Sequence, residues 1–389
     1  MTYRVQTLNA ISRLGLDRLP KETYDVSSEM ADPDAILVRS ADLHGIRIPA
    51  SVQAVARAGA GTNNIPVSEL SARGVVVFNT PGANANAVKE LVLAGMLLAA
   101  RNIVPAATFA ASVEGSDDEI NVAVEKGKKG YVGFELPGRT LGVIGLGAIG
   151  VQVSNAAMAL GMKVLGYDPA ISIRHAWLLG SAATQASSLD ELFVGSDFVT
   201  VHVPLLEATR GLVNAARLAQ MKPGGVVLNF ARGGIVDEAA VLEALASGHL
   251  YAYVCDFPSN ALKGHPRVVA LPHLGASTGE AEENCAVMAA DQLRAYLETG
   301  EIMNSVNFPE ARLRRAEGTT RVAITNSNVP NMVGRISTLL AEHGLNIADL
   351  LNSSRGEYAY TLIDVEGSVA DELVAEIRAI EGVLTVRVL

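Results

Sequence analysis

The sequence predicts an α/β protein with parallel sheets and a small ferredoxin-like domain at its C-terminal end. Three observations lead to this fold class. Short apolar runs alternate with helix-like segments through most of the 389 residues. A glycine-rich turn connects one such strand to a helix in the middle of the chain. Beyond Thr319 the pattern changes to strand, helix, strand, strand, helix, strand, which is the order of a ferredoxin-like domain.

Composition excludes several classes of protein. Lys and Arg number 31 against 41 Asp and Glu, and this net charge of −10 argues against binding to nucleic acid or anionic membranes. Two cysteines, Cys255 and Cys285, provide neither a disulfide framework nor a cysteine-rich metal site. The sequence starts without a signal-peptide pattern, and the longest apolar helix candidate, 91–100, is too short to span a bilayer. We therefore expect a cytoplasmic protein.

The first 90 residues repeat a strand-and-helix rhythm. Strands are predicted at 35–39, 54–57 and 74–78. Polar or glycine-rich loops follow them at 39–41, 58–64 and 79–86. Ligands of open α/β sheets bind beyond the carboxyl ends of strands, so these loops are candidate substrate contacts, although ordinary turn chemistry explains any single Gly or Asn equally well.

Two segments link this part to the middle of the chain. Residues 87–100 predict a buried helix that connects two domains. Residues 101–138 are less regular, with an acidic run at 114–119 and a basic run at 126–129. Charge runs of this kind usually form solvated faces, so we expect no regular core element there.

The chain is organised around residues 140–169. An apolar strand at 141–144 leads into a glycine-rich turn, a helix follows, and a second strand at 163–167 ends at Asp168. This order is typical of a dinucleotide-binding βαβ unit of the Rossmann type. A structural turn in some other α/β protein is the alternative.

Each glycine of the turn has a different expected role. Gly145 allows the tight turn, Gly147 lets the backbone approach a pyrophosphate, and Gly150 lets helix and strand pack closely. The helix N-terminus attracts the phosphates. Asp168 is placed to bind the ribose hydroxyls and would repel a 2′-phosphate, which favours NAD over NADP. The expected contacts here are Gly145, Gly147, Ala148, Ile149, Gly150 and Asp168.

Two later strands end in residues with obvious chemistry. Arg232 follows the strand at 225–229, and His273 follows the strand at 268–271. Arginine grips a carboxylate with two parallel hydrogen bonds, and histidine exchanges protons near neutral pH. Hydride transfer between a 2-hydroxy acid and nicotinamide needs both functions. Each residue alone also fits a structural role, as a loop ion pair or a satisfied histidine.

The remaining elements are expected at regular intervals. Further strands are predicted at 198–202 and 252–255, with helices at 238–247 and 281–297. The C-terminal domain is predicted as strands at 321–325, 347–352, 358–365 and 383–389, with helices at 329–343 and 369–380. This domain has no paired catalytic groups, so we interpret it as a sensor or an assembly module.

Five stretches are long enough to identify a family: 57–66, 79–91, 141–150, 229–234 and 272–278. They resemble the D-isomer-specific 2-hydroxyacid dehydrogenases, in particular the short-form branch that acts on 3-phospho-D-glycerate. The tail resembles an ACT domain, a small amino-acid-sensing module. The resemblance covers essentially the whole chain and implies a discontinuous, flavodoxin-like substrate domain. Its expected bounds are 1–97 with 282–308, then 98–281 for the NAD-binding domain, 309–318 for a linker and 319–389 for the ACT-like domain.

The resemblance also implies roles for individual residues. Arg232 binds the substrate carboxylate and steers the carbonyl, and His273 is the general acid and base. Further cofactor contacts are implied at Phe230, Ala231, Asp256 and Gly275. Substrate contacts are implied at Arg57, Ala60, Gly61 and Asn63, with Arg57 for a phosphate. Positive charge is added by Lys126, Lys128 and Lys129.

One position departs from the family pattern in the catalytic region. The family has a glutamate that orients the catalytic histidine, whereas the stretch after Asp256 holds Asn260 in its place. An asparagine still accepts the imidazole N–H but favours the charged ring less than a carboxylate does. We therefore expect Asn260→Glu to change the pH–rate profile, unless an acid is donated from elsewhere.

The ACT-like tail suggests an amino-acid effector. Asn328 and Asn346 match asparagines that bind L-serine in serine-inhibited relatives, and Asn326 replaces their usual histidine. Asn331 stands where many such domains have a turn glycine. L-serine is therefore the expected effector.

The resemblance implies NAD-dependent oxidation of 3-phospho-D-glycerate to 3-phosphohydroxypyruvate, the first step of phosphorylated L-serine synthesis. Alternatives are another D-2-hydroxy acid, such as glycerate, lactate or 2-hydroxyglutarate, or a non-catalytic NADH-sensing protein. The expected partners are a small phosphorylated 2-hydroxy acid and a second copy of the chain, in a homodimer or homotetramer.

Overall fold

The structure, a computed structural model, describes residues 2–389 and divides into two compact units. The outer unit combines Met1–Asn84 with Gly279–Leu389, and the central unit comprises Ala85–Thr278. Helix α3, Ala85–Ala100, belongs to the central unit, where it packs on α6 and on strands β10 and β11. The domain boundary expected at 97/98 therefore falls inside this helix.

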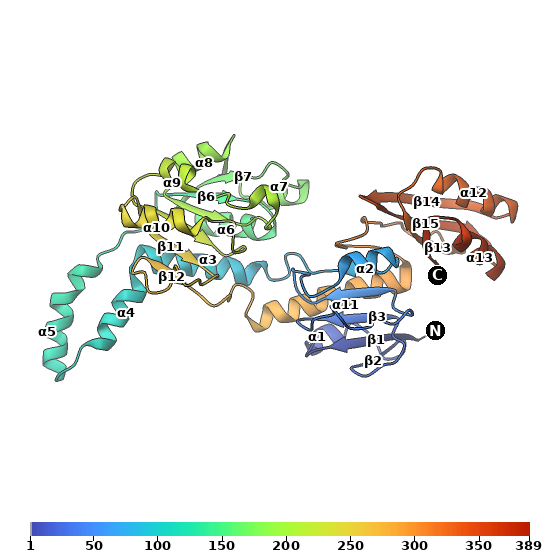
Figure 1. The fold of residues 1–389 in the computed structure, drawn as a ribbon, viewed down its shortest axis with the longest axis horizontal. Coiled ribbons are helices and arrows are strands. Elements are labelled where there is room, and N and C mark those ends of the chain that lie inside the picture. The colour runs from blue at the N-terminus through green and yellow to red at the C-terminus, as the bar shows by residue number, and fades with distance from the viewer. Residues whose placement is uncertain (1) are drawn as a thin grey trace. The chain divides into compact units, whose positions relative to one another are not determined.

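The outer unit begins with a five-stranded parallel sheet (Figure 1). Its strands are β1 (Tyr3–Leu8), β2 (Tyr24–Ser27), β3 (Ala35–Val38), β4 (Ala54–Arg57) and β5 (Val76–Phe78). Their order, β2-β1-β3-β4-β5, is the flavodoxin-like order that the resemblance implied. The helices of this part are α1 (Arg13–Leu16), α2 (Val67–Ala72) and α11 (Gly279–Thr299). Strand β3 is buried at every position, as expected for a parallel sheet with both faces covered.

The central unit contains a seven-stranded parallel sheet. Its strands are β6 (Thr140–Ile144), β7 (Lys163–Tyr167), β8 (Thr184–Gln185), β9 (Phe198–Val201), β10 (Gly225–Asn229), β11 (Leu250–Cys255) and β12 (Val268–Ala270). The helices around it include α6 (Ala148–Ala159), α7 (Ile173–Leu178), α8 (Leu189–Gly195), α9 (Ala215–Gln220) and α10 (Glu238–Ala246). The sheet order, β12-β11-β10-β9-β6-β7-β8, reverses direction beside β6. This confirms a Rossmann-like sheet, whose ligands bind at that switch point.

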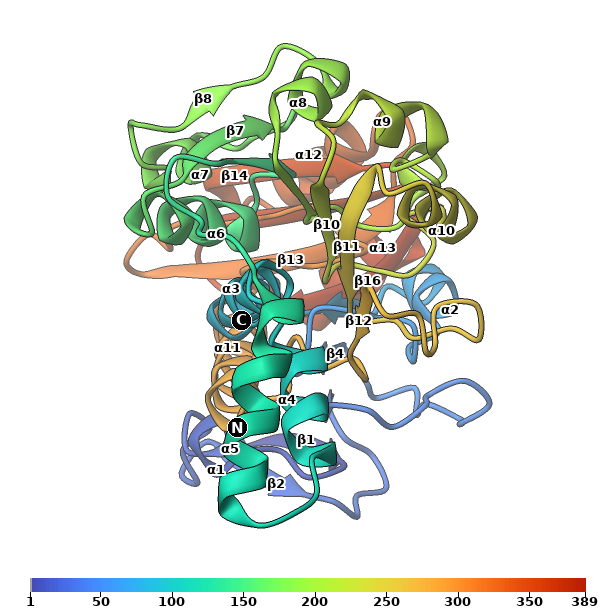
Figure 2. The same cartoon turned by 90° about the vertical axis from the view of Figure 1, so that its left-hand side faces the viewer.

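Residues 101–131, for which no regular element was expected, form a helical hairpin. Helices α4 (Ile103–Ser112) and α5 (Asp117–Gly127) project from the central unit side by side, before a 3-10 turn at Lys128–Tyr131 (Figures 1 and 2). The acidic run is a helix N-terminus, because Ser116 and Glu119 form a capping box. Neither helix contains a buried residue.

The C-terminal domain confirms the predicted order of elements. Its elements are β13 (Thr319–Ser327), α12 (Met332–Glu342), β14 (Asn346–Arg355), β15 (Tyr358–Glu366), α13 (Asp371–Ala379) and β16 (Val383–Val388). The strands pair antiparallel in the order β14-β15-β13-β16, and both helices cover one face of the sheet (Figure 1). This is the ferredoxin-like arrangement of an ACT-like domain.

The C-terminal domain is packed onto the first sheet of its own unit. One hydrophobic cluster includes Tyr296 and Leu297 at the end of α11 together with Tyr360 and Leu362 from β15. Tyr360 donates a hydrogen bond of 2.7 Å to the carbonyl of Gly300. The domain therefore shares a hydrophobic core with the elements before it.

Membrane-spanning potential is limited in the described chain. Within residues 2–389 no single helix has both the length and the apolar character needed to cross a bilayer. Helices α3 and α4 meet that criterion only when taken together, and they are bent by 63° relative to each other.

Candidate active site

The glycine-rich turn has the geometry of a dinucleotide site. Gly145 has a φ of +90°, and a Cβ there would lie 2.7 Å from the carbonyl oxygen of His202. A Cβ on Gly150 would overlap the carbonyl of Gly145, so close packing of helix and strand requires glycine. A Cβ on Gly147 would meet nothing within 4 Å. The open side of this turn, at the N-terminus of α6, fits the pyrophosphate of a dinucleotide.

Asp168 is held beside this turn by backbone hydrogen bonds. Its Oδ2 accepts from the N–H of Leu146 at 2.8 Å, and its Oδ1 accepts from the N–H of Ala170 at 2.9 Å. Ala148 and Ile149 form the first turn of α6. The carboxylate thus stands between the glycine turn and the end of β7, where it can receive ribose hydroxyls. The donor set fits NAD.

We expect Asp168→Asn to weaken the preference of the protein for NADH over NADPH by about tenfold or more, because a negative charge no longer faces the 2′-phosphate. The measurement is the ratio of the two dissociation constants. Asp190→Asn, a change on exposed α8, is the control and should leave the ratio unchanged. An unchanged ratio in Asp168→Asn would contradict the assignment.

Arg232 lies three residues beyond β10, in a turn shaped by a strand residue. Asn229 at the end of β10 donates a hydrogen bond to the carbonyl of Arg232 at 3.0 Å and accepts one from the N–H of Ala231 at 3.2 Å. The Arg232 side chain is exposed, and its Nη1 donates to the carbonyl of Ala231 at 2.7 Å. An exposed guanidinium on a fixed turn is suited to grip a carboxylate.

A buried carboxylate clamps the loop that carries His273. Asp256, at the end of β11, is only 1% exposed. Its two oxygens accept the N–H groups of Leu274 and Gly275, each at 2.7 Å, and its carbonyl accepts the N–H of His273 at 3.1 Å. His273 has a φ of +56°, which is unusual for a residue with a side chain. Asp256 therefore fixes the backbone of the histidine loop, a role that the sequence did not indicate.

The imidazole of His273 is exposed and packs against an aromatic ring. Its ring centre lies 5.1 Å from that of Phe257, at an interplanar angle of 54°. Among the described residues no carboxylate is recorded as a hydrogen-bond partner of this ring. Asn260 is exposed two residues beyond Pro258. The acid of this turn is Glu238, which accepts a hydrogen bond from Ser259 Oγ at 2.6 Å.

The other expected cofactor contacts are part of the same sheet edge. Phe230 is buried, and its ring lies 3.0 Å from where a Cβ on Gly95 of α3 would be. Gly275 is close to Asp256, because a Cβ there would lie 3.2 Å from Oδ2. Strands β10, β11 and β12 are neighbours, so Arg232, Asp256 and His273 all follow the carboxyl ends of adjacent parallel strands.

The candidate substrate residues of the outer unit form a second loop cluster. Arg57 at the end of β4 donates from Nε to the carbonyl of Arg39 at 3.0 Å and from Nη1 to the carbonyl of Gly61. Asn79 donates to the carbonyl of Ala60 at 2.6 Å, and Asn63 is exposed. Two arginines therefore meet at this sheet edge, because β3 and β4 are paired. Arg39 also forms an ion pair with Glu282.

The three asparagines proposed for an effector do not come together in one chain. Asn326 is 1% exposed and donates to the carbonyl of Ser327, whereas Asn328 and Asn346 are exposed. Asn346 aligns with Thr319 at the start of β13 through their shared partner Glu366, and Asn328 follows the end of the same strand. Asn328 and Asn346 thus lie at opposite ends of the sheet.

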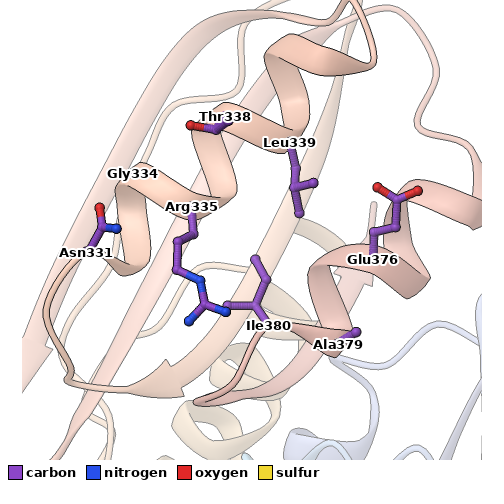
Figure 3. Close-up of a pocket in the computed structure, with 8 residues that line it drawn as sticks. All are labelled: Asn331, Gly334, Arg335, Thr338, Leu339, Glu376, Ala379 and Ile380. Atoms are coloured by element: carbon purple, nitrogen blue, oxygen red, sulfur yellow. The ribbon is translucent and has the colours of Figure 1, made fainter.

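A cavity of about 510 Å³ lies between the two helices of the C-terminal domain (Figure 3). Arg335 and Leu339 of α12 face Ile380 across it, and Glu376 of α13 lines its rim. The carboxylate of Glu376 is already paired, since it lies 3.0 Å from the Nε2 of His343. Asn331 at one end of the cavity has a φ of +64°, which satisfies the backbone need for a turn glycine.

His202, which follows β9 beside the glycine turn, makes the stability of the central unit depend on pH. Burial lowers the pKa of its imidazole from 6.5 to about 3. Within the described chain the buried Nδ1 has no hydrogen-bond partner, and Nε2 lies 3.0 Å from Thr200 Oγ1. The unfolded chain therefore binds a proton below about pH 6.5 that the folded chain does not bind.

The resulting stabilisation is complete above about pH 6.5 and is lost as the pH falls toward about 3. Between pH 7.5 and pH 5, we expect the free energy of unfolding to fall by about 2 kcal/mol more in the unmodified protein than in His202→Asn. Urea unfolding at the two pH values measures this difference. Parallel pH dependence in both proteins would show that His202 protonates in the folded state.

Comparisons with known proteins agree with this geometry. Residues 93–275 match the model of the D-isomer specific 2-hydroxyacid dehydrogenase NAD binding domain. D-3-phosphoglycerate dehydrogenase of Haemophilus influenzae is 36% identical over 343 residues, which cover 85% of this chain and 79% of that protein. The enzyme of that name from Escherichia coli K12 is 34% identical over 345 residues, with the same coverage of 85% and 79%.

A solved structure supports the same relationship. The NAD⁺-bound 3-phosphoglycerate dehydrogenase of Entamoeba histolytica superposes with a TM-score of 0.61 at 26% identity, over 79% of this chain and 99% of that one. The Rossmann-like sheet, the glycine turn with Asp168, and the residues at the ends of β10 and β12 occur together in this chain. The chain therefore belongs to the D-isomer-specific 2-hydroxyacid dehydrogenase family and is an NAD-dependent oxidoreductase.

Proposed function

We propose that this enzyme oxidises 3-phospho-D-glycerate at C2 to 3-phosphohydroxypyruvate, the first step of phosphorylated L-serine synthesis. The observation that carries the proposal is the placement of Arg232, Asp256 and His273 after three adjacent parallel strands. This places a carboxylate binder and a proton acceptor at one sheet edge. Relatives that share 34–36% of their residues with this chain are named for this activity.

The residues divide the chemistry between them. His273 accepts the C2 hydroxyl proton while the C2–H bond breaks and the C2–O bond becomes a carbonyl. Arg232 holds the substrate carboxylate and keeps C2 in one orientation. Bound NAD accepts the hydride at its nicotinamide ring. Asp256 holds the His273 loop through three backbone contacts.

Charge distinguishes this substrate from other 2-hydroxy acids. Arg57 and Arg39 supply two guanidinium groups at the ends of neighbouring strands, and guanidinium is well suited to phosphate. We propose that Arg57 binds the substrate phosphate, with the basic residues of α5 as a further source of positive charge. Glycerate, lactate and 2-hydroxyglutarate lack this group.

The test is NADH oxidation with 3-phosphohydroxypyruvate, hydroxypyruvate, pyruvate and 2-oxoglutarate. We expect kcat/KM to be about 100-fold higher for the phosphorylated acid, and Arg57→Ala to remove most of that preference. Arg13→Ala, a fully exposed change in the same unit, should have no effect. Equal rates with an unphosphorylated acid, unaffected by Arg57→Ala, would assign a different 2-hydroxy acid.

We further propose that L-serine binds between the C-terminal domains of two copies of the chain. The support is geometric, because Asn328 and Asn346 lie at opposite ends of one sheet and meet only if a second domain aligns antiparallel beside the first. Strand β14 is the edge strand next to which such a copy can pair. Inhibition by L-serine that disappears in Asn346→Ala supports this site, and serine-insensitive activity contradicts it.

A further inference from the structure

A cavity of about 520 Å³ lies inside the outer unit, where the C-terminal domain meets the first sheet. One wall is formed by the segment before β4 and by the turn between α2 and β5. The opposite wall is formed by α13 and β16. The two walls touch directly at the edge of the cavity, since a Cβ on Gly74 would lie within 2.5–2.9 Å of Thr325, Thr385 and Leu384. The size is that of a small-molecule site.

Three arginines line this cavity, one from the first sheet and two from the C-terminal domain. They are Arg73, Arg378 and Arg387, and the described lining residues include neither Asp nor Glu. Such a concentration of one charge is notable in a chain with a net charge of −10. Guanidinium groups that share a cavity repel one another, and an anion between them removes that repulsion.

The arginines are held in place largely by neutral groups. Arg387 donates to the carbonyls of Tyr296 and Leu297 at 3.0 and 2.9 Å and lies over the Tyr296 ring. Arg378 donates weakly to the carbonyl of Val386 at 3.4 Å.

Arg73 contacts the only carboxylate recorded near the three described guanidinium groups. It donates to the carbonyl of Pro49 at 2.8 Å and lies 4.0 Å from the exposed Glu69. Carbonyl contacts fix a guanidinium without neutralising it. The positive charge of the cavity is therefore largely uncompensated.

A buried acceptor adds a second requirement for a ligand. Gln53 lines the same cavity, and its Oε1 is buried and has no hydrogen-bond partner among the described residues. A buried amide oxygen without a donor is unfavourable. A ligand that carries a hydroxyl or protonated oxygen besides its negative charge satisfies this atom.

We propose that this cavity binds a small organic or inorganic dianion, a phosphate ester or a hydroxylated polycarboxylate, which bridges the C-terminal domain and the substrate sheet. The anion contacts Arg73 from one wall and Arg378 and Arg387 from the other. Its binding tightens the docking of the C-terminal domain on the half of the enzyme that carries Arg57. The site is separate from the asparagines considered for L-serine.

The experiment is amide hydrogen exchange on the full chain, read by mass spectrometry. Exchange is compared in inorganic phosphate, in citrate and in potassium chloride, all at the same ionic strength. We expect phosphate or citrate to slow exchange in peptides that cover 73–75 and 378–387, relative to chloride. Phosphate alone indicates a phosphate site, and citrate alone indicates a polycarboxylate site. Peptides covering 57–63 report any separate binding at the substrate loop.

Variants separate the site from general salt effects. The double variant Arg73→Gln, Arg378→Gln should raise the anion concentration needed for half protection by about tenfold or more. It leaves the Arg387 contacts with Tyr296 and Leu297 in place, so the domain interface is retained. Arg335→Gln, which removes an exposed arginine of α12 outside the cavity, is the matched control. Protection that is absent in the unmodified protein, or unchanged in the double variant, would overturn the proposal.

Discussion

Replacing His273 with Gln should lower kcat of the NADH-linked reaction by about 10²–10⁴-fold while NADH still binds. Glutamine keeps a polar side chain of similar size, but it does not accept and release a proton near neutral pH. The backbone of the loop is held by Asp256 through Leu274 and Gly275, so the cofactor site should stay intact. Steady-state kinetics and NADH titration together measure the two effects.

A control histidine tests whether the loss is specific. His343→Gln changes a histidine of the C-terminal domain, whose Nε2 is paired with Glu376, and it should retain the activity of the unmodified enzyme. If His273→Gln kept more than about a tenth of kcat, another group would have to carry the proton. Glu238, which contacts the neighbouring Ser259, is then the next residue to change.

Replacing Asp364 with Ala should lower the free energy of unfolding of the outer unit by about 3–5 kcal/mol. Asp364 and Arg321 are both fully buried and form two parallel hydrogen bonds of 2.7 and 2.8 Å. Arg321 also donates to the carbonyl of Thr299 at the end of α11, at 3.0 Å. Removal of the carboxylate leaves a buried guanidinium whose charge is not compensated. Urea unfolding followed by circular dichroism measures the change.

A double variant distinguishes the cost of an unpaired charge from the net contribution of the pair. Arg321→Met with Asp364→Leu removes both charges and fills the space, and it should cost less than Asp364→Ala alone. If the double variant were the less stable of the two, the pair itself would be strongly stabilising. Activity at low temperature should change little in the double variant, because neither residue belongs to the catalytic loops.

The sequence predicted those parts of the site that depend on local chemistry. The turn around Gly145 and Gly150 needs glycine for steric reasons, and such requirements are visible in one sequence. Arg232 and His273 could be singled out because each follows a buried strand, and the strands proved to lie close together in one sheet. The C-terminal domain was predictable because its strand and helix periods change in a recognised order.

Features that depend on distant parts of the chain were not predictable in this way. The clamp by Asp256 joins residues 18 and 19 positions apart, and no local pattern distinguishes a clamping aspartate from a cofactor contact. Its proposed contact with the cofactor stays a prediction. The α4–α5 hairpin was missed because its polar, exposed sequence resembles a loop, although the capping box at Ser116 and Glu119 was a readable helix signal. The arginine cavity brings together residues more than 300 positions apart.

The shared core between α11 and the C-terminal sheet means that this domain is not a detachable module. Truncation after residue 318 would bare Tyr296, Leu297 and Phe308, which now pack within the same cluster as Ala323, Tyr360 and Leu362. A shortened chain would expose a sticky apolar face rather than a clean catalytic fragment. Deletion, the usual way to ask what an appended domain regulates, would therefore report aggregation here, and point substitutions are the appropriate tool.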